Sequence, residues 1–203
     1  MSDELLVQGS PEWIAARVGS LGASRVNEVL PKSRGEGKTR ATRLKEMITE
    51  RLTGKPAPFW ESDAMRIGKE REPIARQAYA IYQDVPVKEC GLFRHPSIAG
   101  THASPDGLVG DSGLVQIKCP QAAAHFDTLE SEKVPDNYLV QMMWEMACTG
   151  RQWCDYVSFN SDFPLRMQIW ICRVNRDAAI IHQLESEVMK FLEELDKRLK
   201  KWS

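Results

Sequence analysis

Along the first eighty residues, apolar positions recur every three or four residues, a spacing that predicts amphipathic helices. Ser10 and Pro11 form a helix start, and Pro31 and Gly54 mark helix stops. Pro73 should kink the longest of these helices, because proline removes a backbone donor. The expected helices cover residues 10–19, 24–30, 39–52 and 62–82.

The rest of the chain combines short apolar runs, bounded by turn residues, with further helical spacing. Strands are expected at 85–93, 98–103, 107–109, 114–118, 153–160 and 166–174, and helices at 122–129, 135–148 and from 176 onward. The last helix repeats an apolar residue at positions 184, 188, 191, 195 and 199, which is typical of a core-facing stripe. This order predicts one domain over 1–203, with an α/β or α+β fold and a central mixed β-sheet flanked by helices.

Candidate chemistry lies in the strand-rich region, where an aspartate and a lysine stand on strands expected to pair. A hairpin turning at 111–112 would set Asp106 within one residue of lying opposite Gln116. Gln116 and Lys118 would share one face of the sheet while Ile117 points into the core. Asp106, an acid at position 116 and the Ile117 carbonyl would suit Mg²⁺, and Lys118 would orient the attacking water. An ordinary turn and strand produce the same local pattern, so this pattern alone does not decide the function.

The composition narrows the class of protein. Formal net charge is −1 over 203 residues, so general affinity for nucleic acid is not indicated. The five cysteines form no CxxC or Cys/His cluster, which argues against zinc or iron–sulfur centres and favours a reduced compartment. We see no apolar run long enough to cross a bilayer and no secretory leader, and therefore expect a soluble cytoplasmic protein without a membrane partner.

Positive charge is concentrated locally. Six basic residues, Arg34 among them, lie between Pro31 and Lys45 against Glu36 alone. This segment is either a solvated loop and helix start or a patch that follows DNA phosphates, and the sequence leaves both open.

Five separated blocks, in one order, resemble the lambda-type exonucleases, the YqaJ-like viral recombinases of the PD-(D/E)xK nuclease superfamily. The blocks are W-x₃-R-x-G with a following G-A-S (13–26), G-x₃-E (68–72), SPDG (104–107), IKCP (117–120) and Y-x-x-Q (138–141). The resemblance implies that Arg17 and Ser24 hold a terminal 5′-phosphate, and that Glu72 joins the metal site. It also places Gln141 near the attacking water and makes Ser104, Tyr138 and Arg34 candidate DNA contacts.

The same resemblance implies an activity and an assembly. Such enzymes are toroidal homotrimers that degrade one strand of a duplex end processively in the 5′→3′ direction. They use two Mg²⁺ ions, or Mn²⁺, and leave a 3′ single-stranded tail for an annealing protein in recombination. A phage or prophage protein acting in a bacterial cytoplasm is therefore expected.

Position 116 departs from the family, which carries a metal-binding glutamate there, whereas this chain has Gln116. Loss of that charge should slow the chemical step by about 10²-fold or more. Two explanations are open: an engineered Glu→Gln exchange, favoured because the other blocks are intact, or a natural variant in which Glu70 or Glu72 compensates.

Two rival functions remain. One is another nuclease of the superfamily, a restriction-type endonuclease or a CRISPR-associated exonuclease. The missing cysteine cluster argues against the iron–sulfur branch, and the Arg17 block favours an end-binding enzyme. The other is a non-catalytic DNA-end-binding scaffold for recombination.

Overall fold

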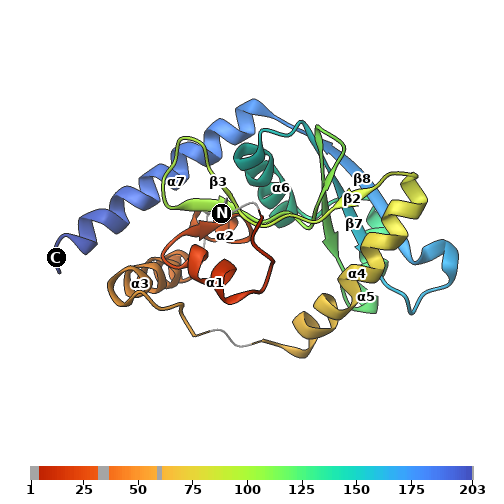
Figure 1. The fold of residues 1–203 in the computed structure, drawn as a ribbon, viewed down its shortest axis with the longest axis horizontal. Coiled ribbons are helices and arrows are strands. Elements are labelled where there is room, and N and C mark those ends of the chain that lie inside the picture. The colour runs from red at the N-terminus through yellow and green to blue at the C-terminus, as the bar shows by residue number, and fades with distance from the viewer. Residues whose placement is uncertain (1–4, 32–36, 59–60, 203) are drawn as a thin grey trace.

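The computed structural model describes residues 5–31, 37–58 and 61–202 (Figure 1). Its elements are α1 (Pro11–Arg17), β1 (Leu21–Gly22), α2 (Ala23–Val29), α3 (Gly37–Thr53), α4 (Asp63–Gln83), β2 (Val87–Lys88), β3 (Phe93–Arg94), β4 (Thr101–Ala103), β5 (Gly107–Val109), β6 (Gly113–Lys118), α5 (Ala122–Ser131), α6 (Asp136–Thr149), β7 (Trp153–Phe159), the short 3₁₀ helix η2 (Leu165–Met167), β8 (Ile169–Asn175) and α7 (Ala178–Leu199). None of the helices in these described ranges has both the length and the apolar character needed to span a bilayer.

The expected helices all form, with small shifts at their ends, but the strand expected over 85–93 is wrong. That segment is divided between β2, which pairs with β5, and β3, which pairs with β4 in a different sheet. The strand expected over 98–103 is reduced to β4, and the one expected over 166–174 begins only at Ile169, after η2. Apolar patterning does not indicate which partner a strand pairs with, so a chain that changes sheets looks like one strand.

A five-stranded mixed sheet, in the order β2-β5-β6-β7-β8, forms the centre of the fold. β6 is antiparallel to β5 and parallel to β7, so the expected central mixed sheet is confirmed. Gly107 pairs with Val115, which sets Asp106 opposite Gln116 as the hairpin predicts. The smaller sheet, β1-β4-β3, packs against α2 and α6.

Alternate residues of β6 belong to two separate cores. Val115 and Ile117 pack with Ala75 and Tyr79 of α4 on one face of the sheet. Leu114, on the other face, joins the larger core that α6 completes. Gln116 has the same parity as Leu114 and is fully buried, so it faces α6. Two-sided burial explains why this strand is apolar at every position except Gln116 and its last residue, Lys118.

Helix α7 lies along one side of the molecule beside α3, while α4 and α5 lie at the other end with the larger sheet (Figure 1). The expected apolar stripe of α7 is confirmed, since Leu184, Val188, Phe191 and Leu195 are buried. Ion pairs add to this contact: Arg40 to Glu194 at 2.6 Å, and Arg51 to Asp196 at 2.8 Å. Helix α3 is thereby held against the C-terminal half of α7.

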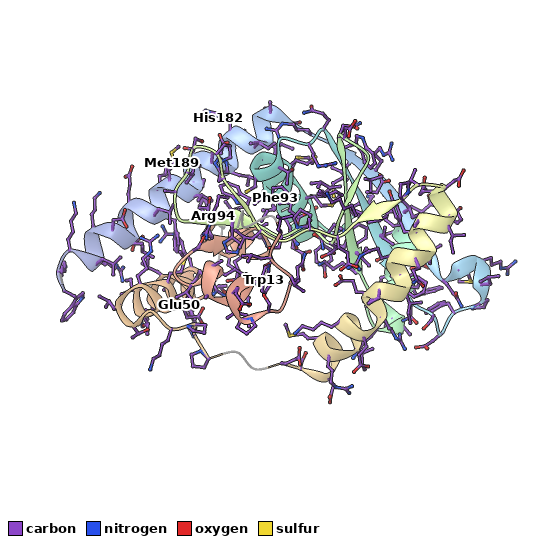
Figure 2. The ribbon with its side chains drawn as sticks, in the orientation of Figure 1. Trp13, Glu50, Phe93, Arg94, His182 and Met189 are labelled. Atoms are coloured by element: carbon purple, nitrogen blue, oxygen red, sulfur yellow. The ribbon has the colours of Figure 1, made fainter. Side chains whose placement is uncertain are left out.

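Truncation of Phe191 should strongly destabilise the protein, because its ring is 0 % exposed in the α7 core. We expect Phe191→Ala to lower the free energy of unfolding by about 3–5 kcal/mol. Met189, two residues away, is 45 % exposed and points outward from α7 (Figure 2). Met189→Ala should change stability by less than about 0.5 kcal/mol. Urea unfolding of both variants measures the difference, and equal losses would contradict the assigned face of α7.

Candidate active site

The candidate site begins where β5 starts and β6 ends, at the carboxylate of Asp106. Asp106 Oδ2 accepts a hydrogen bond from the Ile117 backbone N–H at 2.6 Å and a second from the Gln116 side-chain amide. Burial raises the pKa of Asp106, while the charge of Lys118 and the Ile117 N–H act in the opposite direction. The β5–β6 register therefore brings together the acid, position 116 and the lysine, the three groups that the sequence places on this hairpin.

Helix α4 brings a second carboxylate, Glu72, toward this cluster. Burial, and then the charge of Asp106, raise the pKa of Glu72 to about 7. Arg76, one turn later, pairs with Glu72 at 2.6 Å and donates from Nε to the Asp106 carbonyl oxygen at 3.0 Å. Because the charge of Asp106 opposes ionisation of Glu72, a cation near these two carboxyls would be stabilised.

A chain of buried amides connects Asp106 to α6. Gln141 Nε2 donates to Gln116 Oε1 at 2.8 Å and to Glu145 Oε1, also at 2.8 Å. Glu145 is fully buried, and burial followed by the charge of Asp106 raises its pKa to about 8. Its second oxygen, Oε2, has no hydrogen-bond partner within the part of the chain that the structure describes. Gln141 thus contacts residue 116, and it is accompanied by an acid that the sequence analysis did not select.

Lys118 leaves β6 on the same face as Gln116, as predicted. Its Nζ lies 5.2 Å from the centroid of the Tyr138 ring, a cation–π distance. Tyr138 in turn stacks on Tyr156 of β7, with 5.5 Å between the ring centroids. Tyr138, predicted as a DNA contact, therefore borders both the core and the lysine, and its contact with DNA stays a prediction.

The N-terminal block forms a pocket next to this amide chain. A cavity of about 130 Å³ is lined by Arg17, Ser24, His102 and Ser104 together with Gln141 and Glu145. Trp13 of helix α1, labelled in Figure 2, also lines this cavity. Trp13 Nε1 donates to Ser104 Oγ at 3.2 Å, and the Arg17 guanidinium carbon lies 3.9 Å from the Trp13 ring centroid. Blocks about ninety residues apart in the sequence thus meet at one pocket.

His102 fixes the arginine of this pocket. Burial, and then the charges of Arg17 and Arg94, lower the pKa of His102 to about 3, so its ring is neutral. His102 Nε2 accepts from Arg17 Nε at 3.2 Å, which leaves Nδ1 protonated and donating to Ser20 Oγ at 2.8 Å. Within the described residues the other guanidinium N–H groups of Arg17 make no hydrogen bond, and an anion in the pocket would find them as donors.

The basic segment is only partly described, and Arg34 lies outside the described residues. Two of its other members are engaged in ion pairs within the protein. Arg40 pairs with Glu194, and Arg43 pairs with Glu28 at 2.8 Å and with Glu46 at 2.7 Å. These two arginines therefore make ion pairs within the protein, and contact of the segment with DNA phosphates stays a prediction.

Sequence reasoning missed three residues at the site: Arg76, His102 and Glu145. Glu145 carried a usable signal, since it is the one acid in the apolar stretch 138–148, four residues after Gln141 and therefore on the same helix face. Arg76 stands four residues after Glu72 in the same way. His102 has no comparable signal, because its partners Arg17 and Ser20 are distant in sequence.

The side-chain oxygen atoms at this site decide whether it can hold a divalent cation. Asp106 and Glu72 fit a hard cation, because both are carboxylates whose proximity favours a positive charge between them. Gln116 does not offer an oxygen in the observed orientation, since its nitrogen faces Asp106. Consistently, no group of three or more His, Cys, Asp or Glu side chains poised for a metal occurs within residues 5–31, 37–58 and 61–202. The two acids are present, and position 116 is where a third would stand.

Comparison with known proteins agrees with this geometry. The model of the YqaJ-like viral recombinase domain matches residues 12–152. An alkaline exonuclease (LHK-Exo) from Laribacter hongkongensis is 44% identical, with a TM-score of 0.89, covering 95% of this chain and 96% of that one. LHK-Exo in complex with dAMP is similar at 44% identity and a TM-score of 0.90, with the same coverage.

A phage-related exonuclease from Haemophilus somnus 129PT shares the fold, with a TM-score of 0.73, 18% identity and coverage of 91% of this chain and 96% of that one. Among curated proteins, none matches the chain. The family match spans well over half of the sequence and includes the blocks around Arg17, Glu72, Asp106 and Gln141. The expected fold class and the expected family are both confirmed, and the chain belongs to the YqaJ-like viral recombinase family, with the mixed α/β fold of an alkaline exonuclease.

Proposed function

We propose that this protein acts on the ends of double-stranded DNA as a metal-dependent 5′→3′ exonuclease whose chemistry is impaired by Gln116. One observation carries the proposal: Gln141 hydrogen-bonds to Gln116 and also lines the pocket of Arg17 and Ser24. An anion held in that pocket would lie next to the carboxylate cluster. A relative at 44% identity was solved in complex with dAMP, a nucleoside 5′-phosphate, which fits a pocket of this kind.

The pocket suits the terminal phosphate of a DNA strand. Arg17 offers charge-assisted hydrogen bonds, and Ser24 adds a hydroxyl. Ser104 Oγ accepts from Trp13 and donates to no acceptor among the described residues, so its hydroxyl hydrogen can donate into the pocket. These donors recognise a phosphate and not a base, so binding would depend on the strand end and not on sequence.

The hydrolytic centre would follow from Asp106, Glu72 and Lys118. A divalent cation, Mg²⁺ or Mn²⁺ and as many as two ions, would be held by Asp106 and Glu72 with the Ile117 carbonyl, and would supply Lewis-acid activation of water and phosphate. Lys118 would offset charge on the phosphate and orient the water, and Gln141 Oε1 would accept a hydrogen bond from that water. In the described residues no hydrogen bond occupies Gln141 Oε1, which supports this role.

The wider assignment follows the family. We propose a toroidal homotrimer that encircles DNA and works processively, which would explain how a subunit of net charge −1 stays on its substrate. The 3′ single-stranded product would be passed to an annealing protein for recombination in the cytoplasm of a phage-infected or prophage-bearing bacterium.

A second candidate function is a DNA-end-binding scaffold without catalysis. The observation in its favour is the Gln116 nitrogen facing Asp106, which leaves the site without the third acid. An internally cutting nuclease is a third possibility, which closed circular DNA distinguishes from the other two.

Restoring an acid at position 116 should restore activity. We expect Gln116→Glu to degrade 5′-phosphorylated linear duplex in Mg²⁺ about 10²-fold or more faster than the unmodified chain, because the negative charge stabilises the cation and the transition state. Closed circular DNA should remain intact. Opening of the circle would show an endonuclease, and inactivity of both proteins despite binding to DNA ends would favour the scaffold. Equal activity of the two would shift the metal site toward Glu72.

Arg17 should determine preference for a phosphorylated end. In the Gln116→Glu background, Arg17→Met should reduce the discrimination between 5′-phosphate and 5′-hydroxyl duplexes by about 10- to 100-fold, since hydrogen bonds to charged groups contribute about 1.5–3 kcal/mol. Initial rates on the two substrates measure this ratio. Arg198→Met is the control, because Arg198 lies on α7 and pairs with Glu194. Unchanged discrimination in Arg17→Met would place the phosphate elsewhere.

A further inference from the structure

The hydrogen-bond chain from α6 to β5 has a direction. Glu145 Oε1 accepts from Gln141 Nε2, and the same nitrogen donates to Gln116 Oε1. Gln116 Nε2 then donates to Asp106 Oδ2. A carboxyl oxygen without a proton can only accept, and a neutral carboxyl still accepts at Oε1 when its proton is on Oε2. The two amides are therefore oriented from both ends of the chain, by Asp106 Oδ2 and by Glu145 Oε1.

Reversing the chain would create mismatched contacts at one end or the other. If the Gln116 amide alone turned, its NH₂ group would face the NH₂ group of Gln141. If both amides turned, the Gln141 oxygen would face the Glu145 oxygen. Gln116 and Glu145 are 0 % exposed and Gln141 is 9 % exposed, so water cannot readily repair such contacts.

We propose, on the basis of the nuclease function above, that Glu145 is a positioning residue which holds the Gln141 amide as a hydrogen-bond donor toward position 116. With glutamine at this position, the consequence is that nitrogen, and not oxygen, faces Asp106. With glutamate at this position, the same donor engages one oxygen and turns the other toward Asp106, where a cation can use it. Glu145 thus supports metal binding by an acid at 116 and opposes metal binding by Gln116.

This role predicts an effect whose sign depends on residue 116. Glu145→Met removes the acceptor while keeping a similar side-chain volume. In the unmodified chain it removes one of the two acceptors that hold the amides, so that the Gln116 oxygen can turn toward a cation bound at Asp106. Affinity for Mn²⁺ should then rise about 3- to 10-fold, the range of one net hydrogen bond. In the Gln116→Glu background it releases the carboxylate, and affinity should fall by a similar factor. Glu145→Gln keeps an accepting oxygen and should leave both affinities within about twofold.

The experiment is a calorimetric titration of Mn²⁺ into the six combinations of Gln116 or Gln116→Glu with Glu145, Glu145→Gln or Glu145→Met. A loss of affinity on Glu145→Met in both backgrounds, shared by Glu145→Gln, would show that Glu145 acts by its charge and would overturn the proposal. If circular dichroism shows that Glu145→Met does not fold, Gln141→Met takes its place, because it removes the donor to residue 116. Its change in Mn²⁺ affinity should likewise have opposite signs in the Gln116 and Gln116→Glu backgrounds.

A measurement made without metal tests the positioning role of Glu145 independently of the proposed nuclease function. In ¹⁵N spectra of the unmodified chain, the side-chain NH₂ protons of Gln116 and Gln141 should exchange slowly with water. Glu145→Met should accelerate exchange at both, whereas Glu145→Gln should not. Unchanged protection in Glu145→Met overturns the positioning role even if the Gln116→Glu protein digests DNA. Loss of protection supports it even if no variant binds Mn²⁺, a result that would contradict only the metal-dependent chemistry.

Discussion

The pairing of β5 with β6 is the constraint on which the site depends. Because Gly107 pairs with Val115, Asp106 comes opposite Gln116 and accepts from the Ile117 N–H. A shift of one residue would turn Gln116 toward α4 and Ile117 toward α6, exchanging a polar and an apolar side chain between two cores. The buried side chains on both faces of β6 therefore protect the site geometry as well as the fold.

Burial is also the reason why the site has unusual electrostatics. Glu145 is fully buried and Glu72 is partly buried, and their pKa values rise to about 8 and about 7. Such groups cost stability unless they are hydrogen-bonded or paired, and here Arg76 and Gln141 supply partners. Glu145 lines the pocket of Arg17, whereas Glu72 interacts with Asp106. Raised carboxyl pKa values are typical of functional sites, and the proposed DNA end is a charged ligand that such a site suits.

The fold was largely predictable because the helices are long and strongly periodic, and because the 111–112 turn defines one hairpin. The error at 85–93 shows the limit, since β2 and β3 carry the same kind of residues but join different sheets. At the site, motif positions led to Arg17, Glu72, Asp106 and Gln141, and the structure brings all four to the two adjoining parts of one site. The acid–amide contacts between them were not predictable, because they depend on the separation of α6 from β6.

The sequence by itself determined that Gln116 and Lys118 share a strand face, that Asp106 lies across the hairpin, and which family the blocks resemble. These follow from periodicity, turn chemistry and motif spacing, all of which are local. Only the tertiary structure decided that Glu145 contacts Gln141 in a buried chain, that His102 holds Arg17, and that the Gln116 nitrogen faces Asp106. Each of these depends on which helix packs against which strand, and packing of distant segments determines where a hydrogen-bond donor meets its acceptor.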